Sequence, residues 1–181
     1  MKAFTIEEAV GWITATGLAA DPVARRVSLA DSTGYVFTVR WPKILPYQVP
    51  YFAALFLPGN PEAIDDCLFW ISDNGATASM DFELAYKMMG MLRASHAEDR
   101  PLLESPAYLL GRTDSVDARL LLTMAVLFCW DAYVVPQHGR YFIWIDDDEA
   151  ADVWCKNQDD FEGLVKKFTK LGIVPEVAPS N

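Results

Sequence analysis

One run of acidic side chains is the part of the sequence best suited to chemistry. Asp146, Asp147, Asp148 and Glu149 are consecutive, and Asp152 follows them closely. They come directly after an apolar stretch that we expect to be a strand, and ligands often bind where strands end. Alternate residues of an extended chain point to one side, so Asp146 and Asp148, with Glu149, could hold Mg²⁺ or Ca²⁺ through oxygen atoms. The other interpretation, which we favour, is a solvated acidic turn.

Two arginines are candidates for binding an anion. Arg93 follows a Met-rich face of a predicted helix, and Arg112 lies between a predicted strand and the start of the next helix. Guanidinium groups pair with carboxylates and phosphates in a bidentate manner, and the start of a helix also favours anions. Because acidic residues are abundant, intramolecular salt bridges are the alternative role for both side chains.

Catalytic and cofactor motifs are missing from the sequence. The two histidines, His96 and His138, lie in polar, turn-like contexts, where exposed positions are expected. Neither a serine nucleophile elbow nor a glycine-rich phosphate loop occurs, and the zinc and calcium motifs are also absent. The three cysteines, Cys67, Cys129 and Cys155, are far apart in apolar stretches and predict buried, reduced thiols. We therefore expect no cofactor.

The charge of the chain argues against several kinds of partner. There are 25 acidic and 15 basic residues, which give a formal net charge of -10. Residues 131–162 hold nine of the acids and only two of the bases. Nucleic acids and anionic membranes attract basic surfaces, so neither is expected to bind. Glu7 and Glu8 interrupt any signal-peptide pattern, and the longest apolar run, 120–130, is too short for a membrane span. We predict a cytoplasmic protein.

Periodicity and turn signals divide the chain into helices and strands. A capping box at Thr5 and Glu8 predicts the first helix. Further helices are expected at 51–57, 80–95, 115–129 and 161–171. Strands are expected at 26–30, 35–41, 67–72, 107–110, 132–135, 141–145 and 152–155, with 26–30 and 35–41 paired as a hairpin.

These elements predict an α/β or α+β fold. We expect one mixed β-sheet of about five to seven strands, packed by about four to five helices. The strand at 141–145 is apolar on both faces and should be central. The alternation of strands and helices in the middle of the chain permits right-handed βαβ crossovers. Residues 1–174 would form one globular domain and 175–181 a tail.

The tryptophans have two interpretations. Four of the six, Trp70, Trp130, Trp144 and Trp154, fall in or beside predicted buried elements. Aromatic rings with a few polar groups can form the walls of a ligand pocket. Core packing is the commoner role for such large side chains, and we favour it.

Several segments resemble an uncharacterised family of bacterial hypothetical proteins. They are residues 68–75, 91–93, 129–136 and 141–149, over roughly the C-terminal two-thirds of the chain. The family pattern has Ser-His-Asp-Glu where this chain has Asp146, Asp147, Asp148 and Glu149, so a histidine is missing. The resemblance implies no activity. In size and acidity the chain is also similar to immunity proteins of bacterial toxin systems.

Three hypotheses about function follow from the residues. The first is a non-enzymatic cytoplasmic protein that binds a basic protein, such as a toxin or nuclease domain, through Asp146, Asp147, Asp148, Glu149 and Asp152. Complementary charge would speed this encounter and set its specificity. The second is an enzyme with a divalent cation at the acidic run. The third is a homo-oligomer with its interface in residues 47–57. We favour the first.

Overall fold

A computed structural model describes residues 1–31, 33–41, 46–60, 63–73, 82–146 and 150–177. The helices are α1 (Ile6–Ala15), α2 (Val49–Ala53), α3 (Phe82–Ser95), α4 (Ser115–Leu127) and α5 (Gln158–Lys170), with 3-10 turns η1 (Pro46–Gln48) and η2 (Ala54–Phe56). The strands are β1 (Lys2–Phe4), β2 (Leu18–Asp21), β3 (Arg26–Leu29), β4 (Tyr35–Arg40), β5 (Gly59–Asn60), β6 (Ala63–Ile64), β7 (Cys67–Asp73), β8 (Ala107–Leu110), β9 (Asp131–Pro136), β10 (Tyr141–Asp146), β11 (Ala150–Cys155) and β12 (Glu176–Val177). The fold is α+β.

Eight strands form one large sheet in the order β1-β8-β7-β9-β10-β11-β4-β12. Every neighbouring pair in this sheet is antiparallel. The sheet is therefore larger than predicted, and the expectation of mixed pairing was wrong. After α3, residues 96–106 return the chain to the end where β7 finished, so β8 runs against β7. The strands β8 and β9 are parallel to each other, but β7 lies between them and α4 crosses over it.

The predicted first helix is confirmed. The backbone N–H of Thr5 donates to Glu8 Oε2 at 2.8 Å, and the backbone N–H of Glu8 donates to Thr5 Oγ1 at 3.2 Å. This capping box satisfies two N–H groups that lack partners within the helix. In α5 the Asn157 side chain has the same role, since it accepts from the backbone N–H of Asp160 at 2.9 Å.

One face of the sheet, which we call the helix face, carries the main core. Side chains from β4, β7, β9, β10 and β11 pack there against α2, α3, α4 and α5. Phe37 illustrates the packing, because its ring meets Phe161 and Phe168 of α5 edge-on, with centroids 5.6 and 5.9 Å apart. The central position predicted for the strand at 141–145 is confirmed, since β10 lies between β9 and β11.

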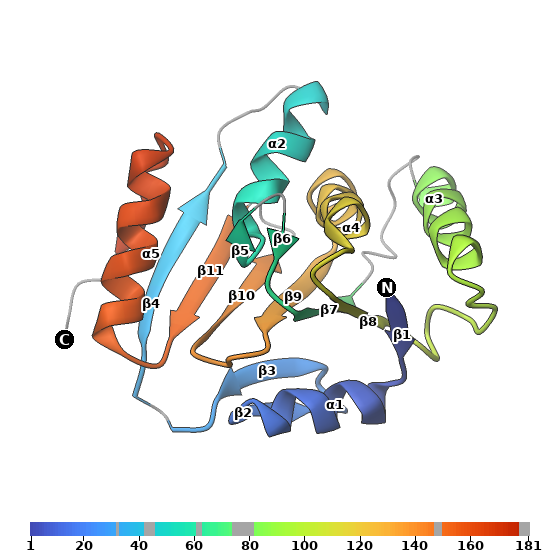
Figure 1. Cartoon of the computed structure of the whole chain (residues 1–181), viewed down its shortest axis with the longest axis horizontal. Coiled ribbons are helices and arrows are strands. Elements are labelled where there is room, and N and C mark those ends of the chain that lie inside the picture. Colours follow the sequence, from blue (N-terminus) through green and yellow to red (C-terminus); the bar gives the residue numbers. More distant parts are fainter. Residues whose placement is uncertain (32, 42–45, 61–62, 74–81, 147–149, 178–181) are drawn as a thin grey trace.

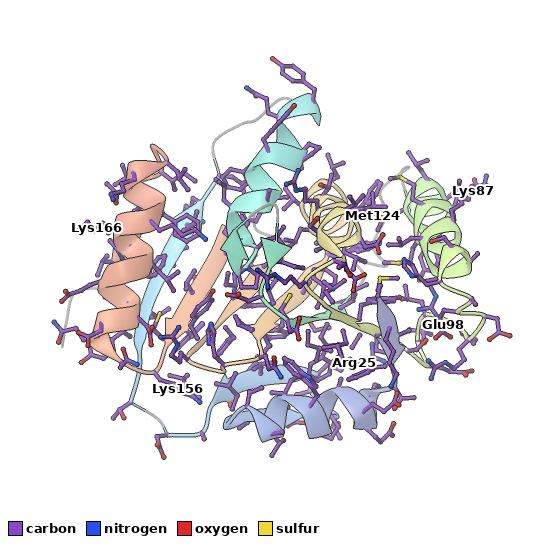
Figure 2. All side chains as sticks on the ribbon, viewed as in Figure 1. Arg25, Lys87, Glu98, Met124, Lys156 and Lys166 are labelled. Carbon is purple, nitrogen blue, oxygen red and sulfur yellow. The ribbon has the colours of Figure 1, made fainter. Side chains whose placement is uncertain are left out.

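The opposite face, which we call the hairpin face, is covered by α1 and by the β2–β3 hairpin (Figure 1). The expected pairing of 26–30 with 35–41 was wrong, because β3 pairs with β2 instead. The Asp21 carboxylate closes the β2–β3 turn by accepting from the backbone N–H groups of Val23 and Ala24 at 2.8 and 2.9 Å. Lys156, labelled in Figure 2, donates to the Thr16 carbonyl oxygen at 3.2 Å and ties the end of β11 to α1.

The edges of the sheet are its shortest strands. At one edge, β1 contributes three residues. At the other, Glu176 and Val177 of the expected tail pair with Thr38 and Phe37 of β4. None of the helices in the described part of the chain has the length and apolar character needed to cross a membrane.

Candidate binding face

Two tryptophans and two aspartates project from the hairpin face of β10 and β11. Trp144 is directly paired with Asp152 across these strands, and Trp154 is paired with Phe142. Asp146 lies two residues after Trp144, so it points to the same side. We call Trp144, Trp154, Asp146 and Asp152 the Trp–Asp patch; all four side chains are half-buried.

The two indoles lie beside Tyr133 and Phe142 on the same face of the sheet, and these four rings form an aromatic floor. Trp144 is stacked with Tyr133 at an interplanar angle of 18° and a centroid distance of 6.4 Å. Trp154 is stacked with Phe142 at 7° and 6.2 Å. Parallel pairs of this kind hold each other's orientation, whereas Tyr133 and Phe142 lie at 55° to each other, so the two pairs do not share one plane.

The floor opens into a cavity of about 400 Å³ beside the β2–β3 hairpin. The polar groups along its rim are Arg26, Ser28 and Asp31. Burial raises the pKa of Tyr133, although hydrogen bonding with the Val27 backbone opposes the rise. An aromatic cavity with a few polar groups at its rim is typical of a binding site.

Hydrogen bonds fix the acidic part of the patch. Thr38 Oγ1 donates to Asp152 Oδ1 at 2.6 Å, and a carboxylate has a second oxygen that can accept from a ligand. Farther along β4, Arg40 pairs with Glu176 at 3.2 Å. A cationic side chain lying over Trp144 could reach the Asp152 carboxylate, because directly paired residues have Cβ atoms only about 5 Å apart. The arrangement is suited to a guanidinium or ammonium group.

The acidic residues singled out in the sequence are only partly described. Asp146 and Asp152 lie on one face of the sheet, whereas Asp147, Asp148 and Glu149 lie outside the described residues. The metal site expected at Asp146, Asp148 and Glu149 therefore rests mostly on residues whose structure is not described. Within the described ranges, no group of three His, Cys, Asp or Glu side chains could hold a metal ion.

The structure places Arg93 inside the protein. Its side chain is 5% exposed and donates to the Ser105 carbonyl oxygen at 2.9 Å and to Ser105 Oγ at 2.8 Å. It also donates to the Tyr108 hydroxyl and to the Arg100 carbonyl oxygen. Arg93 thus holds the loop between α3 and β8, and this internal role uses the donors that an anion would need.

Arg112 lies apart from Arg93, at a polar cavity of about 490 Å³. Asp65, Asp66 and His138 line the same cavity, so an anion bound at Arg112 would also lie near two carboxylates. His138 Nδ1 accepts from the backbone N–H of Arg140 at 3.1 Å, and burial lowers the pKa of the ring. The two carboxylates beside the guanidinium make this cavity less favourable for an anion than Arg112 alone would.

The cysteines differ in part from expectation. Cys67 and Cys155 are buried, but Cys129 is exposed, so the prediction of three buried thiols was wrong for Cys129. It follows α4 with a positive φ of 51°, which turns the chain toward β9 and leaves the thiol outside the core. Residues 47–57 are the segment in which a homo-oligomer interface was expected. Two tyrosines of this segment, Tyr47 and Tyr51, are 69% and 79% exposed.

Core packing was the favoured role for all four tryptophans: Trp70 and Trp130 are buried, and Trp144 and Trp154 pack against the core but remain partly exposed. The sequence did contain a pattern that places Trp144 and Trp154 beside aspartates on one face. In Trp144-Ile145-Asp146 and Asp152-Val153-Trp154, a tryptophan and an aspartate alternate with one aliphatic residue, which places them on one face. The sequence could not show that α1 and the β2–β3 hairpin cover the hairpin face only partly.

Comparison with known proteins adds no relative to this description. The chain matches no family model, no curated protein and no solved structure. The function has to be argued from the geometry of the chain itself.

Proposed function

We propose that this chain is a non-enzymatic cytoplasmic protein that binds a basic protein partner on its hairpin face. The observation that carries the proposal is the direct pairing of Trp144 with Asp152, beside Trp154 and Asp146. An arginine of the partner would stack on an indole and pair with the adjacent carboxylate, and both interactions favour guanidinium over neutral groups. Tryptophan is also among the residues that contribute most at protein interfaces.

The acidic run strengthens this proposal through charge. Asp147, Asp148 and Glu149 connect the two strands that carry the patch, so their charge adds to that of Asp146 and Asp152. Clustered charge of one sign speeds the encounter with a partner of the opposite sign. A basic toxin or nuclease domain, held in the manner of an immunity protein, has the charge that this face selects.

A binding screen with matched variants tests the proposal. The purified chain is immobilised and exposed at low salt to a panel of small basic proteins, including catalytically inactivated nuclease domains. We expect binding that weakens about tenfold for Trp144→Ala and for Asp152→Asn. The control is Asp159→Asn on α5, which removes the same charge elsewhere and should weaken binding less than about threefold. The proposal fails if no panel member binds, or if the control weakens binding as much as Asp152→Asn.

A further inference from the structure

A separate groove lies on the helix face, between η2 and α5. Its volume is about 540 Å³, within the range of sites that hold small ligands. Leu55, Leu57 and Leu171 line it together with Ala54, so much of its surface is apolar. Apolar side chains that line a cavity of this size would contact the apolar part of a small ligand.

Three lysines of α5 stand around this groove: Lys166, Lys167 and Lys170. Lys166 is labelled on α5 in Figure 2. None of the three forms an ion pair with any residue in the described ranges, although the chain has a net charge of -10. By contrast, Lys87 on α3 pairs with Glu83 at 2.6 Å. Unpaired cations beside an apolar groove select an anion that also carries apolar surface.

Lys167 is the least solvated of the three. Its Nζ donates to the Leu57 carbonyl oxygen at 3.5 Å, at the edge of hydrogen-bonding distance. Burial lowers the pKa of its ammonium group, with Asp65 acting in the opposite direction. A half-buried ammonium without a carboxylate partner is unfavourable, and a bound anion would relieve that cost. The dipole of α5 explains why lysines are favourable in the last turn of this helix. It does not explain the apolar surface beside these lysines.

We propose that this groove binds an anionic amphiphile, with its head group at the three lysines and its alkyl chain over the leucines. The class includes free alkyl carboxylates and alkyl phosphates. This site is independent of the Trp–Asp patch, because it lies on the other face of the sheet and its charge is opposite. We expect a free, monomeric amphiphile as the occupant, since the groove has the size of a single small ligand.

A glycine in the groove allows the site to be blocked without harming the fold. A Cβ added at Gly163 would meet nothing within 4 Å, so a side chain can project there freely. Gly90 on α3 is equally open and lies outside the groove. Replacing either helical glycine by leucine should favour the helix, so both variants should remain folded. Gly163→Leu places an apolar side chain at a residue that lines the groove, and Gly90→Leu is its matched control.

Calorimetric titration with octanoate, below its micelle-forming concentration, tests the proposal. We expect saturable binding by the natural chain and by Gly90→Leu, and a loss of at least about tenfold in affinity for Gly163→Leu. Lys167→Gln should weaken octanoate binding about tenfold, whereas Lys87→Gln should leave it unchanged. Octanol, which lacks the charge, and acetate, which lacks the chain, should both bind more weakly than octanoate.

Three outcomes would overturn the proposal. The first is equal affinity of the natural chain and Gly163→Leu for octanoate, because the ligand would then lie elsewhere. The second is octanol binding as tightly as octanoate, because the lysines would then contribute nothing. The third is binding to phosphatidylglycerol vesicles with none to octanoate, which would identify a membrane surface as the source of the anion.

Discussion

The indole of Trp144 and the carboxylate of Asp152 stand next to each other on the hairpin face, because their residues are directly paired between β10 and β11. Tyr133 stacks on the indole, and Thr38 donates to the carboxylate at 2.6 Å. Both groups are therefore held in place before any partner arrives. Preorganised groups lose little conformational freedom on binding, and this is why the pair is the centre of the proposed site.

The turn between β9 and β10 should be intolerant of any side chain at Gly139. The residue has a φ of +58°, and a Cβ there would collide with the Thr16 backbone. We expect Gly139→Ala to lower the free energy of unfolding by about 3 kcal/mol, through both strain and the displacement of α1. Gly172→Ala is the control, since Gly172 also has a positive φ but open space around it, and it should cost about 1 kcal/mol. Urea unfolding measures both; equal losses would show that the contact with Thr16 is unimportant.

Long periodic segments could be predicted from the sequence, and their arrangement could not. The first helix was found from Thr5 and Glu8 because capping depends on residues only three apart. The pairing of β3 with β2 was missed because Leu18–Asp21 is a short strand with no clear alternation, and Asp21 forms the turn. The strand Glu176–Val177 has only two residues, which is too short for a recognisable pattern. It is a strand because it pairs with β4, and this pairing is a tertiary contact.

Arg93 should be a stability residue, in contrast to Arg112. Arg93→Ala leaves the Ser105 carbonyl oxygen and the Tyr108 hydroxyl without their partner, and we expect a loss of about 3 kcal/mol in the free energy of unfolding. Arg112→Ala removes an exposed side chain and should change that free energy by less than about 0.5 kcal/mol. Chemical denaturation compares the two variants. Similar losses would contradict the structural role given to Arg93.

Glu98 should make stability depend on pH in the acid range. Hydrogen bonding from the Arg100 side chain lowers the pKa of Glu98 from 4.5 to about 2 in the folded chain. As the pH falls, Glu98 is therefore protonated in the unfolded chain before it is protonated in the folded chain. The stability that ionised Glu98 gives to the folded chain is complete above pH 4.5 and is lost as the pH falls to about 2. Glu98→Gln should be less stable than the natural chain at pH 7 and equally stable near pH 2.

Unfolding curves over that pH range measure the difference between the two proteins. Arg100→Gln should reproduce the loss at pH 7, and the double variant should add little because the partners act together. A difference that stays constant between pH 7 and pH 2 would contradict the assignment.

Thiol chemistry should separate the three cysteines. Burial raises the pKa of Cys67 and of Cys155 to about 12, so neither forms a thiolate readily in the folded chain. Cys129 is exposed and should react alone with a thiol-specific reagent. We expect one reactive thiol in the natural chain, none in Cys129→Ser, and three in urea. Rapid labelling of a second thiol in the folded chain would show that one of the buried sites opens.

The candidate site shows the same limit of sequence reasoning as the fold. The charge of residues 131–162 directed attention to β10 and β11, because acidic residues are visible by counting. The role of Trp144 and Trp154 depends on how far α1 and the β2–β3 hairpin extend over the sheet. That extent is set by tertiary contacts such as the one between Gly139 and Thr16, which no local pattern encodes.

The central claim is that the Trp–Asp patch recognises cationic side chains, and the indole N–H signals of the six tryptophans report on it most directly. A tetra-arginine peptide is titrated into the ¹⁵N-labelled chain at low salt, and two-dimensional NMR follows each indole. We expect the signals of Trp144 and Trp154 to shift saturably, while those of Trp12, Trp41, Trp70 and Trp130 stay in place. Shifts confined to the other four tryptophans, or no shift at any of them, would contradict it.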